Sequence, residues 1–237
     1  MKIVVNHLTR MQQGYICVSG LKLGTCHHVR PILSGNRLST SLLRRNGGPF
    51  DMAVIVDLGT VKPHPQNPEV EDHIFDPTKA TAIGTLTSSK FWTLLTQVAE
   101  RKLVSIFGED LTIRGTKSCG VDVGKGVASL GCLIPSSPPE IYLKQREGKP
   151  DQIRMCVGDG CFELDLGVTD IRLYCDDHQT PNKRLVKKIA DRIRDEKAVI
   201  LSIGLTRPFT SLSGFPPIHW LQLNNIHLKS DPTWRLE

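Results

Sequence analysis

The stretches KIVVNHL (2–8), GYICVSGL (14–21), HHVRPIL (27–33) and AVIVDLGTV (53–61) decide the fold class of this protein. They are short runs of mostly apolar, often β-branched residues, and glycines mark their turns and ends. Four such runs within about sixty residues are typical of a small barrel or sandwich. The sequence therefore predicts a mainly β fold, of the β-rich α+β kind.

Other segments show helical periodicity. Residues 89–107 start with the N-capping Ser89 and place apolar side chains on one face before a glycine. Residues 181–196 follow an N-capping threonine and begin with proline, which suits the first position of a helix. We therefore predict helices over 89–107 and 181–196, and a shorter one over 37–46.

A proline-rich segment divides the chain. Residues 135–139 read PSSPP, and proline cannot donate to a strand ladder and favours extended backbone. This predicts a first domain over 1–134 with the 89–107 helix, a linker over 135–139, and a second domain over 140–237 with the 181–196 helix. The β-like runs after the linker lie at 140–145, 152–157, 161–166, 170–175, 198–206 and 218–228.

Charge is distributed unevenly along the chain. The formal net charge is +6, and residues 1–50 hold seven Lys and Arg side chains without a single Asp or Glu. From 51 to 76 the balance inverts, with six carboxylates against one lysine. The first segment is therefore predicted to form an anion-binding surface.

Two arginines recur in similar surroundings. Leu8-Thr9-Arg10 returns late in the chain as Leu205-Thr206-Arg207, and both Arg30 and Arg207 precede a proline. An arginine held at a strand end suits bidentate contact with a phosphate or a base edge. The alternative is that these arginines cap backbone carbonyls where a strand ends.

The run 218–228 alternates as a strand does. Trp220, Gln222 and Asn224 would share one face, and such a face can present aromatic and amide groups to stacked bases. The alternative is that Trp220 belongs to the core.

The segment 62–78 contains four prolines among carboxylates and is predicted to be an ordered loop without ladder strands. Its Glu69, Glu71, Asp72 and His73 could hold a divalent ion for phosphodiester chemistry. The alternative is a solvated acidic loop that docks against the basic N-terminal surface.

No complete catalytic motif is present. Cys26-His27-His28 and the later cysteines lack a Cys-x-x-Cys pair, and the glycines at 120, 124 and 126 do not have the spacing of a phosphate loop. We expect no cofactor, and the sequence leans away from an enzyme. The enzyme question stays open because absence of a motif does not exclude catalysis.

The seven cysteines are odd in number and irregularly spaced, which indicates a reducing cytoplasm rather than a disulfide framework. The N-terminal apolar run is too short for a signal peptide, and no run approaches the length of a transmembrane helix. A cytoplasmic protein without a membrane partner is expected.

Several short motifs together resemble one protein family. They are NHLTR (6–10), VRP (29–31), PEVEDH (68–73), GLTRPF (204–209) and HWLQLNNIH (219–227). They look like a bacterial family of dual OB-containing domain proteins, with similarity along the full length. The resemblance implies two OB-like β-barrels, each with an accompanying helix, and nucleic-acid or nucleotide recognition by fold analogy. It supplies no catalytic residue.

These observations favour a non-catalytic module that binds nucleic acid, most of all single-stranded DNA or RNA, through basic barrel surfaces. The residues predicted to bind are Arg10, Arg30, Arg37, Arg44, Arg45, Lys187, Lys188, Arg207, Trp220, Gln222 and Asn224. One alternative is a protein-interaction subunit of a bacterial complex, for example one in phage defence. Another is a metal-dependent enzyme that processes nucleotides or nucleic acid.

Overall fold

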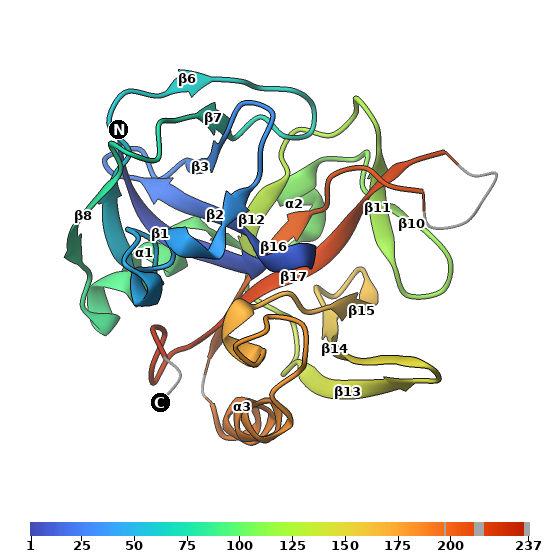
Figure 1. The fold of residues 1–237 in the computed structure, drawn as a ribbon. Coiled ribbons are helices and arrows are strands. Elements are labelled where there is room, and N and C mark those ends of the chain that lie inside the picture. Colours follow the sequence, from blue (N-terminus) through green and yellow to red (C-terminus); the bar gives the residue numbers. More distant parts are fainter. Residues whose placement is uncertain (197, 211–215, 235–237) are drawn as a thin grey trace.

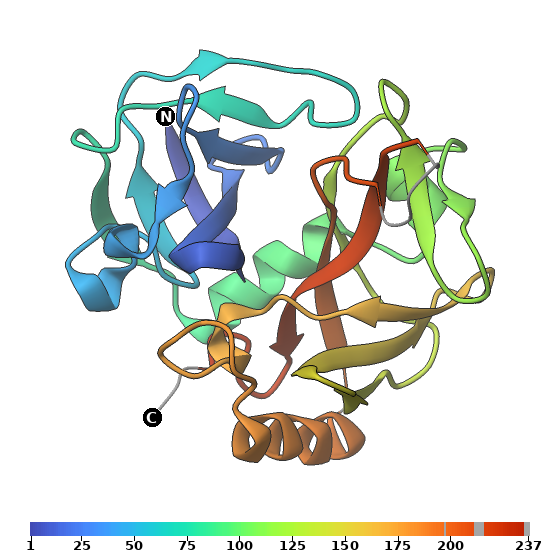
Figure 2. The same cartoon turned by 45° about the vertical axis from the view of Figure 1, so that its right-hand side comes forward.

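The computed structural model describes residues 1–196, 198–210 and 216–234 of the chain. It is β-rich, as the sequence predicts, with curled sheets around two hydrophobic cores (Figure 1, Figure 2). Residues 197, 211–215 and 235–237, which belong to the predicted second domain, lie outside the described residues.

The first sheet is formed by the N-terminal part of the chain. Its strands follow the order β6-β7-β3-β2-β1-β5-β8, and β4 pairs with β2. Their bounds are β1 (Lys2–Arg10), β2 (Tyr15–Lys22), β3 (His28–Ile32), β4 (Leu38–Ser39), β5 (Val54–Asp57), β6 (Lys62–Pro63), β7 (Asp72–Ile74) and β8 (Thr81–Thr85). The four predicted runs are confirmed as β1, β2, β3 and β5. The prediction that 62–78 has no ladder strands is wrong, because β7 pairs in parallel with β3.

The second part holds two further sheets. One has the order β10-β11-β17-β16-β12-β9, and the other has the order β13-β14-β15. Their bounds are β9 (Ala99–Glu100), β10 (Thr112–Ile113), β11 (Cys119–Asp122), β12 (Leu130–Leu133), β13 (Glu140–Arg146), β14 (Lys149–Gly158), β15 (Glu163–Gly167), β16 (Val199–Leu205) and β17 (Ile218–Leu228). The run 170–175 is no strand, since it forms the 3-10 turn η4 (Ile171–Leu173).

The strand pairing crosses the Pro135–Pro139 segment. Strand β12 precedes it and pairs with β16, while β11 pairs with β17. Residues that precede the proline-rich segment therefore complete a sheet whose central strands come from the end of the chain. The segment does not divide the strands between the sheets, and a division into two separately folding domains stays a prediction.

The helix predicted over 89–107 is two helices, α1 (Ser88–Val98) and α2 (Leu103–Phe107). Thr87, and not the predicted Ser89, caps α1 by accepting from the Lys90 N–H. Between them β9 pairs with β12, and Ile134 donates its N–H to the Glu100 carbonyl at 2.9 Å. These ladder bonds give the backbone an alternative to continuing the helix. The segment 37–46 likewise forms two 3-10 turns, η2 (Thr40–Leu42) and η3 (Arg44–Asn46), in place of one helix. A further 3-10 turn, η1 (Gln12–Gly14), precedes β2.

The helix predicted over 181–196 is confirmed as α3 (Lys183–Asp195). Asn182, and not the predicted Thr180, caps it by accepting from the Leu185 N–H at 3.1 Å. Its buried stripe of Val186, Ile189 and Ile193 packs on the second core, and α3 lies against β13 at the bottom of Figure 1. Among the described residues, no helix is long and apolar enough to cross a membrane.

Strands β1 and β17 join the two parts. The Asn225 side chain accepts from the Leu8 N–H at 2.7 Å and donates to the Leu8 carbonyl at 3.1 Å. The Arg10 N–H extends this seam by donating to the Thr169 carbonyl at 2.9 Å. Buried amide and backbone groups that satisfy one another in this way fix the relative position of the two parts.

Candidate nucleic-acid interface

A groove opens between the first sheet and the turn η4. Its volume is about 360 Å³, and it is lined by Leu8, Leu43, Arg44, Arg45, Phe50, Asp51, Ile171 and Arg172. The apolar members are buried, whereas Arg44 and Arg45 are exposed. The groove therefore combines an apolar floor with two cations at its rim.

The local backbone places these two arginines. They form the turn η3, which Gly47 ends with a φ of 90°, a conformation that glycine adopts without steric cost. Arg44 donates to Thr85 Oγ1 at 3.1 Å, and Arg45 donates to the ring of His178 at 2.7 Å from Nε2. Burial first, and then the adjacent Arg45, lower the pKa of His178, so its ring accepts this hydrogen bond in the neutral form.

Arg10 lies beside the same loop. Its guanidinium donates to the His178 carbonyl at 3.0 Å and sits 4.4 Å from the ring centroid of Tyr174. The structure thus brings Arg10, Arg44 and Arg45 together, although they come from two separate segments of the sequence.

Other predicted cations lie apart from this groove. Arg37 is exposed and stacks near Tyr15, with 5.6 Å to the ring centroid. Lys187 and Lys188 are exposed on α3, where Lys187 pairs with Asp191 at 3.2 Å. The two lysines of α3 form a second basic surface, on an element that does not line the groove.

Arg30 and Arg207 are engaged by the acidic segment. Arg30 is only 4% exposed and bonds to Asp72 at 2.5 Å. Arg207 is half exposed and pairs with the other oxygen of Asp72 at 2.5 Å and with Glu69 at 3.2 Å. In this conformation neither guanidinium presents a free bidentate face to a nucleic acid, because both already bind carboxylates.

The candidate metal ligands of the acidic segment are likewise engaged. Glu71 accepts from the Ser129 N–H at 2.8 Å, from the Ser129 hydroxyl at 2.7 Å and from the Leu130 N–H at 3.1 Å. His73 Nδ1 lies 2.8 Å from the Glu71 carbonyl. Glu69, Glu71 and Asp72 are all buried. The segment therefore docks on the basic N-terminal part as its alternative interpretation predicted, but the carboxylates of Glu69, Glu71 and Asp72 are buried rather than solvated.

The predicted base-stacking face of β17 is largely covered. Asn224 is 4% exposed and its amide nitrogen lies 3.0 Å from His7 Nδ1. Trp220 is half-buried, with its ring 6.4 Å from that of Phe209, and Gln222 is half-buried too. The predicted alternation of β17 is interrupted near Asn224, where the pairing with β16 shifts register between Ser202 and Ile203. The opposing β1 covers the Asn224 end of this face.

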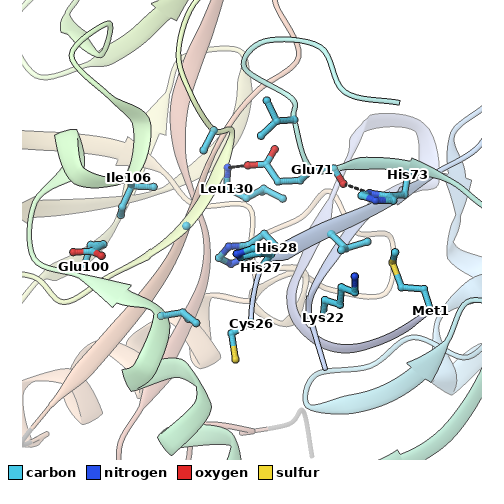
Figure 3. A pocket seen from close by; sticks show the side chains of 15 residues that line it. Met1, Lys22, Cys26, His27, His28, Glu71, His73, Glu100, Ile106 and Leu130 are labelled. Carbon is cyan, nitrogen blue, oxygen red and sulfur yellow. Dashed lines mark hydrogen bonds between the residues drawn. The ribbon is translucent and has the colours of Figure 1, made fainter. Parts of the chain in front are cut away.

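A second cavity, of about 490 Å³, lies near β3, β7 and β12 (Figure 3). Its polar lining consists of Lys22, Cys26, His27, His28, Glu71, His73 and Glu100. Sequence reasoning did not predict either hollow, since each is lined by residues that are far apart in the chain and follow no local motif.

A buried histidine gives the fold a measurable pH dependence. Burial lowers the pKa of His227 to about 3, against about 6.5 in an unfolded chain. Between about pH 6.5 and pH 3 this histidine is protonated in the unfolded chain but neutral in the folded protein. As the pH falls through this range, the free energy of unfolding should therefore decrease by up to about 1.4 kcal/mol per pH unit from this group. Urea unfolding between pH 7.5 and 5 should show a shallower decline for His227→Gln than for wild type; equal declines would contradict this.

A comparison with known protein families identifies the family of this chain. The dual OB-containing domain matches residues 1–226. No curated protein matches the chain. A solved structure of a murine DNA-binding protein bound to double-stranded DNA is 8% identical over 96% of each chain, with a TM-score of 0.31, a likeness too low to carry an argument. The family match spans almost the entire chain, and this protein belongs to the dual OB-containing domain family.

Proposed function

We propose that this protein is a non-catalytic module that binds single-stranded DNA or RNA, with Arg44 and Arg45 contacting the phosphate backbone. The observation that carries the proposal is the groove of about 360 Å³, in which these two guanidiniums flank a floor of apolar side chains. OB folds bind single strands by combining a basic groove with surfaces on which bases pack.

The cations of the groove are available for exchange. Arg45 pairs with Asp176 at 3.4 Å, but the Asp176 carboxylate is fully exposed, and such surface pairs contribute little. A phosphate can therefore replace this carboxylate at small cost. Arg10 is more firmly held by Tyr174 and the His178 carbonyl, and we assign it to positioning the rim.

The exposed face of α3, including Lys187 and Lys188, is a second basic surface that can contact the phosphate backbone. The seven cysteines are all free thiols, which fits a protein that works in the reducing cytoplasm.

The test is fluorescence anisotropy with labelled single-stranded DNA, single-stranded RNA and duplex DNA at several salt concentrations. Loss of both rim cations in Arg44→Ala/Arg45→Ala should weaken single-strand binding about tenfold or more. It should also reduce the slope of log K against log salt by about 0.7 per lost phosphate contact.

The control is Lys125→Ala, which removes one exposed cation from the turn after β11, a strand of a different sheet from β4 and β5 on either side of η3. Its affinity should stay near that of wild type. No binding to any of the three nucleic acids would overturn the proposal in favour of a protein-interaction subunit. Equal weakening by Lys125→Ala would show that net charge, rather than the groove, determines binding.

A further inference from the structure

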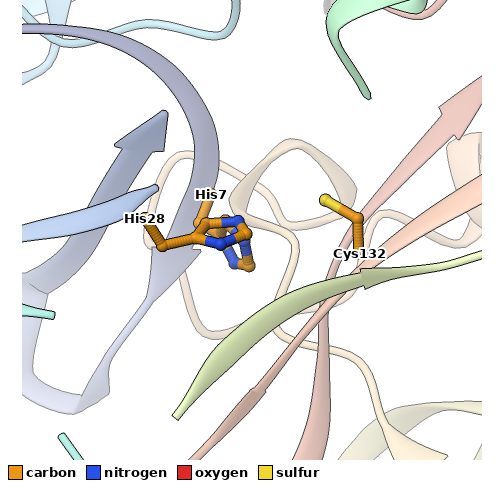
Figure 4. Close-up of side chains that lie close together, drawn as sticks. All are labelled: His7, His28 and Cys132. Atoms are coloured by element: carbon orange, nitrogen blue, oxygen red, sulfur yellow. The ribbon is translucent and has the colours of Figure 1, made fainter. Parts of the chain in front are cut away.

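Three side chains from three different strands meet between the two parts of the molecule. His7 comes from β1, His28 from β3 and Cys132 from β12, and Figure 4 shows the cysteine sulfur turned toward the two rings. Their candidate ligand atoms all lie within 4.8 Å of one another. We propose that His7, His28 and Cys132 form a binding site for a transition-metal ion, Zn²⁺ by preference.

The lone pairs of two candidate ligands converge on one point. The Asn6 amide nitrogen lies 3.2 Å from His28 Nε2 and 3.4 Å from Cys132 Sγ. The partly positive hydrogens of the Asn6 amide thus lie where a metal ion could bind both His28 Nε2 and Cys132 Sγ. On metal binding, this amide must give way to the ion.

The third candidate ligand has an unused nitrogen. His7 is only 1% exposed, and its Nε2 has no hydrogen-bond partner among the described residues. Its Nδ1 faces the Asn224 amide, whose Oδ1 also has no partner in the described part of the chain. Rotating that amide by half a turn lets Nδ1–H donate to Oδ1, which is how metal-binding histidines are commonly oriented, and leaves Nε2 for the ion.

The geometry needs only a small adjustment. Zinc takes nitrogen at about 2.1 Å and thiolate sulfur at about 2.3 Å, so a tetrahedral site holds its ligand atoms roughly 3.5 Å apart. The upper bound of 4.8 Å therefore requires a closure of roughly 1 Å. His28 also lines the cavity of about 490 Å³, from which a water molecule can supply the fourth ligand.

The chemistry of the donors suits this class of ion. Imidazole and thiolate together select Zn²⁺ over the hard cations Mg²⁺ and Ca²⁺. Burial lowers the pKa of His28 to about 4, so its ring is in the neutral form that binds metals. Burial raises the pKa of Cys132 to about 11, so the ion must displace the thiol proton when it binds.

The sequence did not indicate this site, because its ligands follow no local spacing. His7 and His28 belong to two motifs of the first sheet, while Cys132 lies far along the chain on β12. Only the packing of β12 beside β1 and β3 brings the thiol to the imidazoles.

The test uses full-length, tag-free protein, freed of metal with a chelator and then titrated with Co²⁺ and Zn²⁺. Wild type should bind one Co²⁺ per chain with the near-ultraviolet absorption of a cobalt–thiolate bond, and Zn²⁺ should abolish that absorption. Zn²⁺ should also raise the melting temperature, because an ion that binds the folded state stabilises it.

Cys132→Ser should lose the cobalt–thiolate absorption, whereas the matched control Cys119→Ser should keep it, since Cys119 is an equally buried cysteine on β11. His28→Gln changes a partly exposed residue and leaves the buried Cys132 thiol in place. It should lose stoichiometric binding, which tests the site even if Cys132→Ser fails to fold. The proposal is overturned if wild type shows no cobalt–thiolate absorption, if Cys132→Ser retains it, or if Cys119→Ser loses it equally.

Discussion

Asp170→Asn should lower the free energy of unfolding by about 3–5 kcal/mol, because it leaves a buried guanidinium without its counter-charge. Asp170 is 0% exposed and forms a bidentate pair with Arg172, at 2.9 Å to Nε and 2.7 Å to Nη2. The same carboxylate accepts from the Ile226 N–H at 3.1 Å. The Asp170 carboxylate thus accepts hydrogen bonds from both η4 and β17.

Other contacts hold the Arg172 guanidinium in its buried position when Asp170 loses its charge. Its guanidinium lies 3.7 Å from the ring centroid of Trp234 and donates to the Trp234 carbonyl at 3.1 Å and to the Ile226 carbonyl at 2.9 Å. Urea unfolding monitored by circular dichroism measures the loss. Asp176→Asn, which changes an exposed carboxylate, is the control and should change little. Equal midpoints for the two variants would contradict the assignment of Asp170 as a structural counter-ion.

Asp72→Asn should have an effect of similar size, about 3–5 kcal/mol, because Asp72 is the counter-ion of the buried Arg30. The pair is 5% and 3% exposed, and Arg30 Nη2 already has no hydrogen-bond partner among the described residues. Further loss of the carboxylate charge would leave a desolvated cation inside the first sheet.

Arg207 provides the matched control, since it pairs with the same carboxylate but is half exposed. Arg207→Gln should cost less than Asp72→Asn, because the guanidinium that it removes is half exposed and Asp72 keeps the buried Arg30 as its partner. The double variant Arg30→Met/Asp72→Asn should be more stable than Asp72→Asn alone, because it removes the unpaired charge. A single Asp72→Asn no more destabilising than Arg207→Gln would show that Arg30 finds another partner or reaches water.

Local sequence patterns predicted the strands well where runs of apolar residues are bounded by turn-forming residues. The strand over 218–228 and the glycine-bounded runs on β1 and β2 could be recognised without knowledge of their neighbours. The segment 89–107 shows where this fails: its apolar periodicity continues through Ala99 and Glu100, yet these residues pair with β12. A long-range ladder overrides helical propensity there, and no local signal reveals it.

The sequence by itself determined that this is a β-rich chain of the dual OB type, with a basic N-terminal segment and an acidic segment after it. Only the tertiary structure decided which charged side chains are buried and which are exposed. It buries Arg30 against Asp72, leaves Arg44 and Arg45 at the rim of a groove, and brings Cys132 to His7. The physical reason is that backbone propensity acts between near neighbours in sequence. Burial and pairing of a side chain depend instead on which distant strand packs against it.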